Sequence, residues 1–72
     1  MDALAGIYRN VYRCLAEAGV EYKSFSVSLS DGVEIIVDSK EAEQPRLRIA
    51  LMCIEKHLPP AWKDKIKVKV IP

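Results

Sequence analysis

The chain has 72 residues, of which 50% are hydrophobic and 29% are charged, and its formal net charge is +1. This balance is typical of a small globular protein and argues against a disordered chain or a strongly basic nucleic-acid protein. Chains this short bury only about 60% of their unfolded surface, so we expect one domain, residues 1–72, with a marginal core.

The sequence carries no sign of a secretory signal or a membrane span. Asp2 stands where a signal peptide has positive charge, and the longest apolar run, residues 49–54, is too short to cross a bilayer. Two cysteines, Cys14 and Cys53, are too few for a secreted disulfide scaffold. We therefore expect a cytoplasmic protein. Asn and Gln occur once each, a depletion also found in proteins of thermophiles.

A first helix is predicted over residues 3–18. Asp2 suits the N-cap, and Gly19 suits the glycine position that follows a last helical turn. The apolar residues that recur at helical spacing are Leu4, Ile7, Tyr8, Val11, Leu15 and Ala18.

Two strands are predicted next, at residues 22–29 and 33–38. Each alternates apolar and polar residues, and Asp31 and Gly32 between them are typical of a tight turn. The alternation predicts that odd-numbered residues from 25 to 37 point into the core together, leaving serines and acids to solvent.

The length of the turn decides the register of this hairpin. A two-residue loop would place Leu29 opposite Glu34 and bury the acid with the core. We therefore expect a three-residue loop, residues 30–32, with Gly32 in the left-handed region. The expected pairs are Leu29 with Val33, Val27 with Ile35, and Phe25 with Val37.

A second long helix is predicted over residues 45–58, after a polar lead-in at residues 39–44 that can hold a turn of its own. Proline is favoured at the first helical position, so Pro45 is expected to begin the helix, and the two prolines after Leu58 end it. The alternative is one helix that begins at Ser39 and is kinked at Pro45.

The chain is predicted to end in a helical turn at residues 60–64, which folds Trp62 over the core, and a third strand. A right-handed crossover makes this strand parallel to the second one. It can lie beside either earlier strand, but acids in residues 31–43 and lysines in residues 63–69 favour the second. Its buried face is Ile66, Val68 and Val70.

The predicted fold is α+β, a two-layer sandwich of order α-β-β-α-β with two helices on one face of a three-stranded mixed sheet. Over most of the chain this order resembles type II KH domains, BolA-like proteins and the scaffold domain of iron–sulfur assembly proteins. The functional motifs of those families are missing, because Gly6, Gly19 and Gly32 form no G-x-x-G, no C-x-x-C occurs, and His57 is the one histidine. The resemblance therefore implies an architecture and no activity.

One group of residues has metal-binding chemistry. Cys53 and His57 stand four residues apart on the second long helix, and Cys14 on the first helix is a third candidate ligand. Structural zinc usually takes four ligands, so we interpret the cysteines as small buried hydrophobes and His57 as a partner of the helix C-terminus. Without a phosphate loop or an activated nucleophile, we expect no enzyme activity, no metal, no cofactor and no small-molecule substrate.

The two long helices carry the best candidate binding surface. Arg9, Tyr12 and Arg13 combine arginine with an aromatic ring, which is the chemistry of protein hot spots. The second helix is apolar beyond its core stripe, through Ile49 and Met52. We expect a binding module that self-associates as a homodimer or binds a protein partner. The first alternative is an ordinary amphipathic first helix, whose tyrosines lie at the edge of the core and whose arginines extend to solvent. The second is that the first helix and Trp62 cover the second helix completely.

A small nucleic-acid-binding protein is the alternative function. The basic residues available for phosphate contacts are Arg9, Arg13, Arg46, Arg48, Lys63, Lys65, Lys67 and Lys69. The open face of the predicted sheet has small serines and no aromatic platform for stacking bases. Outward lysines on a terminal strand also protect a sheet edge from aggregation, so we prefer the protein-binding interpretation.

Overall fold

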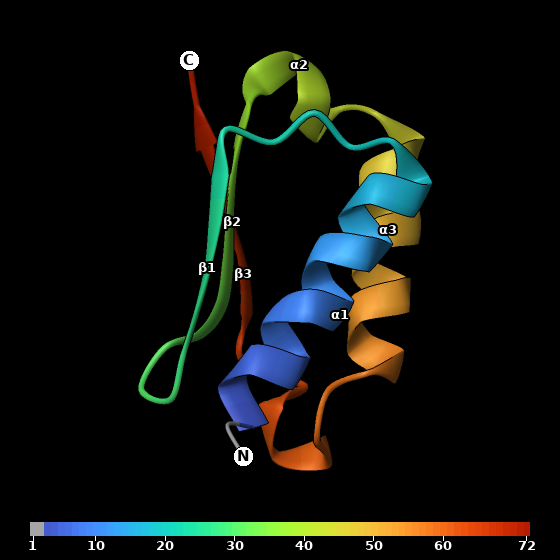
Figure 1. Cartoon of the computed structure of the whole chain (residues 1–72). Helices are drawn as coiled ribbons and strands as arrows, with labels where there is room; N and C mark the ends of the chain where they lie inside the picture. The colour runs from blue at the N-terminus through green and yellow to red at the C-terminus, as the bar shows by residue number, and fades with distance from the viewer. Residues whose placement is uncertain (1–2) are drawn as a thin grey trace.

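The computed structural model of the protein describes residues 3–72 (Figure 1). Its elements are α1 (Ala3–Ala18), β1 (Ser24–Ser28), β2 (Gly32–Asp38), α2 (Ser39–Ala42), α3 (Pro45–Lys56), a 3₁₀ turn (Pro60–Trp62) and β3 (Ile66–Ile71). The predicted α+β order is confirmed, and α2 is the separate turn expected in the lead-in. The expected N-cap, Asp2, lies outside the described residues.

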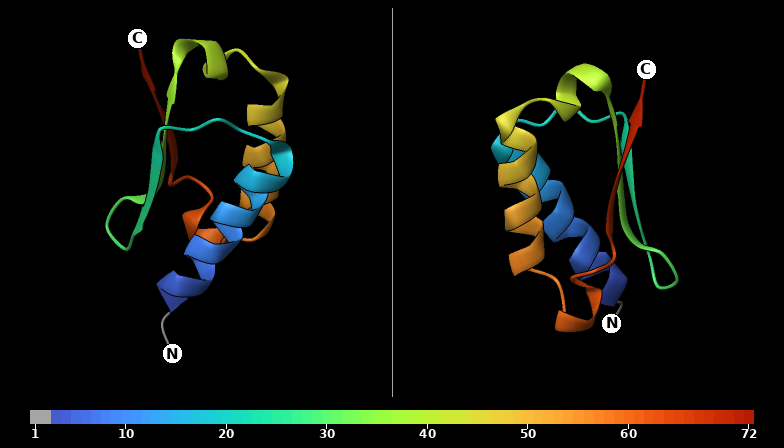
Figure 2. Two further views of the ribbon diagram at one scale, coloured as in Figure 1. Left: turned by 45° about the horizontal axis from the view of Figure 1, so that its top comes forward. Right: turned by 180° about the vertical axis from the view of Figure 1, so that it is seen from behind.

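The strands form one mixed sheet with the order β1-β2-β3. β1 is antiparallel to β2, and β3 is parallel to β2, so the predicted strand directions and sheet order are confirmed. α1 and α3 lie side by side over one face of the sheet, and α2 lies at its end (Figures 1 and 2). Within residues 3–72, no helix combines the length and the apolar character needed to span a membrane.

α1 ends where the sequence predicts, because Gly19 takes a backbone conformation that most residues avoid. Its φ is 74°, in the left-handed region. This turn lets the backbone N–H of Gly19 donate to the Ala16 carbonyl, and that of Val20 to the Leu15 carbonyl. Carbonyl groups at the end of the helix are thereby satisfied, and Val20 is turned into the core.

The junction between α2 and α3 excludes the alternative of one kinked helix. Gln44 has φ −80° and ψ 135°, the extended conformation that a residue before proline prefers, so α3 begins afresh at Pro45. α2 has a cap of its own: the Asp38 side chain accepts a hydrogen bond of 2.8 Å from the Glu41 backbone N–H.

The hairpin has the predicted parity but a register shifted by two residues. Leu29, which was expected to pair with Val33 in the core, lies in the loop and is 71% exposed. That part of the prediction is wrong. The observed pairs are Phe25 with Ile35, Val27 with Val33, and Ser28 with Gly32.

Contacts at both ends of the loop explain this shift. The Ser28 hydroxyl accepts a hydrogen bond of 3.0 Å from the Asp31 backbone N–H, which closes the turn one residue earlier than predicted. Gly32 has φ 78° as expected, but it already belongs to β2 and lies against Lys65, the residue just before β3. The segment that leads into the third strand, which is distant in sequence, therefore helps to set the register.

The core lies between the inner face of the sheet and the two long helices. The inward side chains of β2 are completely buried, whereas the edge strands are covered less well, and Val70 on β3 is 51% exposed. The inward parity predicted for β2 is thus confirmed, while Val70 is largely outside the core. The buried core consists of Ile7, Val11, Cys14, Leu15, Val20, Val33, Ile35, Val37, Leu47, Ala50, Ile54 and Leu58.

Aromatic rings cover the outer edge of the sheet at β1. The ring centroids of Tyr8 and Phe25 are 4.6 Å apart, and those of Tyr22 and Phe25 are 5.4 Å apart in an edge-to-face arrangement. Such pairs contribute about 0.5–1.5 kcal/mol each beyond the area that they bury. The pair of Tyr8 and Phe25 joins α1 to β1.

Two glycine substitutions test the close approach of β2 and β3. In Gly32→Ala, the new methyl group would overlap the backbone carbonyl of Lys65 and would also sit at a left-handed φ. We expect a loss of at least about 2 kcal/mol in the free energy of unfolding, measured by urea denaturation. Gly6→Ala is the matched control, because nothing lies within 4 Å of its Cβ position, and it should stabilise α1 by about 0.5–1 kcal/mol. Similar effects of both substitutions would contradict this arrangement of the strands.

Candidate functional site

α3 has an exposed apolar strip on the side that faces away from the core. Ile49 is 61% exposed and Met52 is 58% exposed, and residues three apart lie on one side of a helix. The opposite side of α3 is buried through Leu47, Ala50 and Ile54. The alternative that the rest of the chain covers this helix is therefore wrong.

A shallow groove of about 660 Å³ runs along the first half of α3 and the segment that joins it to α2. Its lining is mostly apolar with some polar residues, a composition that protein-binding surfaces commonly have. Its apolar residues are Ala42, Pro45, Leu47, Ile49, Leu51 and Met52, and its polar residues are Glu43, Gln44 and Arg48. The predicted site residues Arg48 and Met52 are thus brought together.

One predicted site residue of α1, Tyr12, lies on a side of this helix that faces away from α3. Cys14 faces α3, and Tyr12 stands two residues earlier, about 200° around the helix axis. Tyr12 is 54% exposed, and Arg9 and Arg13 are also exposed. Tyr12 and the exposed strip of α3 therefore do not form the single surface that the sequence suggests.

Arg46 is engaged within the protein. Its Nε and Nη2 atoms donate to the two carboxylate oxygens of Glu41 at 2.7 and 2.6 Å, and Nη2 lies 3.8 Å from a carboxylate oxygen of Glu21. Glu41 itself is only 3% exposed. The bidentate pair ties α2 to α3, so Arg46 is a structural residue, unlike the exposed Arg48.

This ion pair shifts the pKa values of both partners toward their charged forms. The pKa of Glu41 is lowered, chiefly because Arg46 donates hydrogen bonds to the carboxylate, and burial opposes this effect. The pKa of Arg46 is raised, chiefly by its hydrogen bonds to Glu41. Both shifts show that Glu41 and Arg46 stabilise each other as ions.

The lysines of the last segment face a different direction again. Lys67 and Lys69 are exposed on the open face of the sheet, where Lys67 is the register partner of Glu34. Lys63 and Lys65 are exposed in the segment before β3. The helices cover the opposite face of the sheet (Figure 2). The strand lysines and the helix arginines thus do not form one surface that could follow a phosphate backbone.

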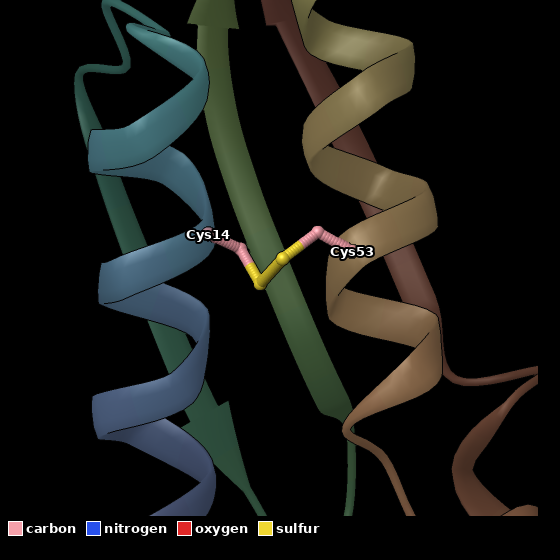
Figure 3. The surroundings of a disulfide bond; sticks show 2 residues. All are labelled: Cys14 and Cys53. Carbon is pink, nitrogen blue, oxygen red and sulfur yellow. A yellow bond between two sulfur atoms is a disulfide. The ribbon is translucent and has the colours of Figure 1, made fainter.

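Cys14 and Cys53 form a disulfide that joins α1 to α3 (Figure 3). Their Cα atoms are 5.7 Å apart, and 39 positions separate them in the sequence. Cys14 is 2% exposed, and Cys53 is partly exposed. Cys14 is thus a buried core residue, as expected, but the disulfide between the two cysteines was not predicted. The sequence predicts that each cysteine lies on a different helix. Only the packing of α1 against α3 shows that the two side chains face each other.

His57 lies next to this disulfide. One ring nitrogen of His57 and the sulfur atoms of Cys14 and Cys53 all lie within 4.8 Å of one another. His57 is the C-cap of α3, one turn after Cys53, and it is exposed. The spacing of four residues predicts that Cys53 and His57 lie close together on α3. That Cys14 joins them is a result of the packing of α1 against α3.

The buried ion pair gives a pH-dependent contribution to stability. Near pH 7, Glu41→Gln is expected to lower the free energy of unfolding by about 1–3 kcal/mol, because Arg46 loses its charged partner. The pKa of Glu41 is lower in the folded protein than in the unfolded chain. The stability that the ion pair supplies is therefore complete above the ordinary carboxyl pKa, and it is lost as the pH falls through the lowered pKa of the folded state. The difference between wild type and variant should therefore shrink below about pH 4.5.

Urea denaturation across this pH range measures the effect. Glu43→Gln is the matched control, because Glu43 is exposed, and it should change stability by less than about 0.5 kcal/mol. A Glu41→Gln deficit of the same size in neutral and acidic solution would show that the ion pair is not its source.

The disulfide is expected to supply a large part of the stability. A cross-link that closes a segment of about 40 residues contributes about 4 kcal/mol by restricting the unfolded chain. Reduced wild-type protein should therefore unfold at a lower urea concentration than oxidised protein. In the Cys14→Ala/Cys53→Ala variant, a reductant should have no effect. Coincident urea-unfolding curves for the oxidised and reduced wild-type protein would rule out a contribution of the disulfide to stability.

Comparison with protein-family models, curated proteins and solved structures finds no significant match to the chain. The likeness to type II KH and BolA-like topologies thus stays one of element order alone.

Proposed function

We propose that the protein is a small non-enzymatic binding module that self-associates through the exposed face of α3. The observation that supports this proposal is the exposed apolar strip of Ile49 and Met52, which also line a mostly apolar groove. Large apolar side chains that lie together on a helix surface mark interaction sites more often than isolated ones do.

A second copy of the same chain suits this strip because the strip is complementary to itself. In an antiparallel pair of α3 helices, Ile49 of one copy would lie opposite Met52 of the other. Arg48 and Glu55, both exposed, stand two helical turns apart on one flank of the strip. The same antiparallel arrangement would bring Arg48 of one copy toward Glu55 of the other, as a twofold interface requires.

The expected association is weak. Full burial of one large apolar side chain contributes about 1.5–3 kcal/mol, so two such residues from each copy contribute about 6–12 kcal/mol. The loss of translational and rotational freedom costs about 4–15 kcal/mol. These terms nearly balance, which favours a concentration-dependent dimer over an obligate one.

The nucleic-acid alternative has less support from the arrangement of charges. Arg46 is engaged with Glu41. By their register and exposure, Lys67 and Lys69 lie on the open face of the sheet, and the helices cover the other face (Figure 2). Binding of a mixed oligonucleotide that weakens steeply with salt would favour this alternative.

A disulfide is compatible with the cytoplasmic location that we propose. Intracellular proteins of hyperthermophiles are often rich in disulfides, unlike those of mesophiles. The single Asn and single Gln of the chain agree with a thermophilic source.

Sedimentation equilibrium tests self-association. Wild-type protein should exceed 8.1 kDa increasingly with concentration, and Ile49→Glu/Met52→Glu should raise the dissociation constant at least about 10-fold, since charge is forced into the apolar contact. Leu29→Glu is the matched control, because it also changes an exposed apolar residue but lies in the hairpin loop. A single 8.1 kDa species at millimolar concentration, or an equal effect of the control, would contradict the proposal.

A further inference from the structure

We propose that Cys14, Cys53 and His57 form a redox-gated metal site, which binds a thiophilic divalent cation such as Zn²⁺ once the disulfide is reduced. In the oxidised protein the two sulfur atoms are bonded to each other and are not available as thiolates. The site would thus alternate between a disulfide and a metal-bound dithiolate.

The positions of the three donor atoms support this site. In a tetrahedral zinc site, with Zn–S bonds of about 2.3 Å and Zn–N bonds of about 2.0–2.1 Å, neighbouring donor atoms are about 3.5–3.8 Å apart. The sulfur atoms of Cys14 and Cys53 and a ring nitrogen of His57 already lie within 4.8 Å of one another. After reduction, the sulfur atoms need only separate to that spacing while the imidazole moves closer, which side-chain rotations can provide.

The donor set also selects the class of metal. Two thiolates and an imidazole are soft to borderline ligands that favour zinc over magnesium or calcium. Cys53 and His57 lie one helical turn apart on α3, so one element positions two of the ligands. Cys14 is held by α1, and the metal would therefore join the same two helices that the disulfide joins.

The burial of the ligands predicts an exchangeable metal. Cys14 is buried in the core, Cys53 is partly exposed, and His57 is exposed. The cation would therefore lie at the boundary between core and solvent. Three protein ligands leave a fourth position for water or an outside ligand. Structural zinc sites usually have four protein ligands, so we expect weaker and reversible binding here.

The disulfide and the metal-bound dithiolate interconvert by a two-electron redox reaction. A small dithiol gives two electrons and two protons to the Cys14–Cys53 disulfide, whose S–S bond breaks to form two thiols, while the dithiol becomes a cyclic disulfide. Zn²⁺ then binds both sulfur atoms as thiolates, and the two thiol protons pass to solvent. In the reverse direction, a disulfide oxidant takes two electrons from the dithiolate and two protons from solvent, so its own S–S bond breaks to give two thiols. The Cys14–Cys53 bond forms again, and Zn²⁺ is released.

The test is a titration of the reduced protein, freed of excess dithiol, with Zn²⁺ against a chromophoric chelator and with Co²⁺ alone. We expect one metal ion per chain and, for Co²⁺, the thiolate charge-transfer and visible bands of tetrahedral coordination. Oxidised protein should bind at least about 100-fold more weakly, since both thiolates are lost. His57→Ala should weaken binding about 10- to 100-fold, and Cys14→Ser/Cys53→Ser should abolish it.

Two controls separate this site from adventitious binding. Lys56→Ala changes an exposed neighbour of His57 on the last turn of α3 and should leave the metal affinity unchanged. Should the reduced chain unfold, Zn²⁺ is expected to restore its circular dichroism spectrum, and to fail to do so in His57→Ala. Equal metal binding by the oxidised and reduced protein, an affinity independent of His57, or the absence of binding and refolding would each overturn the proposal. These results do not depend on whether the protein self-associates.

Discussion

Helices α1 and α3 are held against each other over β2 at Cys14 and Cys53, and several properties of the molecule depend on this contact. It closes the core above the completely buried inner face of β2. It also fixes the rotation of α3, so that Ile49 and Met52 point to solvent. The same contact brings the exposed His57 beside two sulfur atoms that come from different helices.

The redox state of this contact matters because the domain is small. A cross-link worth about 4 kcal/mol is a large fraction of the roughly 5–15 kcal/mol by which native proteins are stable. A second tie, the ion pair of Arg46 with Glu41, secures the other end of α3. A helix fixed at both ends loses little further freedom on binding, which suits α3 as an interaction surface.

Local signals were sufficient to predict the elements, and non-local contacts caused the errors. Gly19 and Pro45 set the helix boundaries through their own backbone preferences, and alternation gave the inward parity of β2. The predicted register of the hairpin was wrong because it left out the contact of Gly32 with Lys65, which lies in a distant segment of the chain. The disulfide and the internal role of Arg46 were missed for a related reason: helical spacing places a side chain on one side of a helix but does not identify its neighbour.

The contact between α1 and α3 can be tested directly by mapping the disulfide of the protein purified without reductant. Proteolysis and mass spectrometry under non-reducing conditions should yield one cross-linked pair of peptides, containing Cys14 and Cys53 from the same chain. Dilute protein should show no free thiol after denaturation. Two titratable thiols that air oxidation fails to join, or cross-links formed only between chains, would contradict the arrangement of α1 against α3.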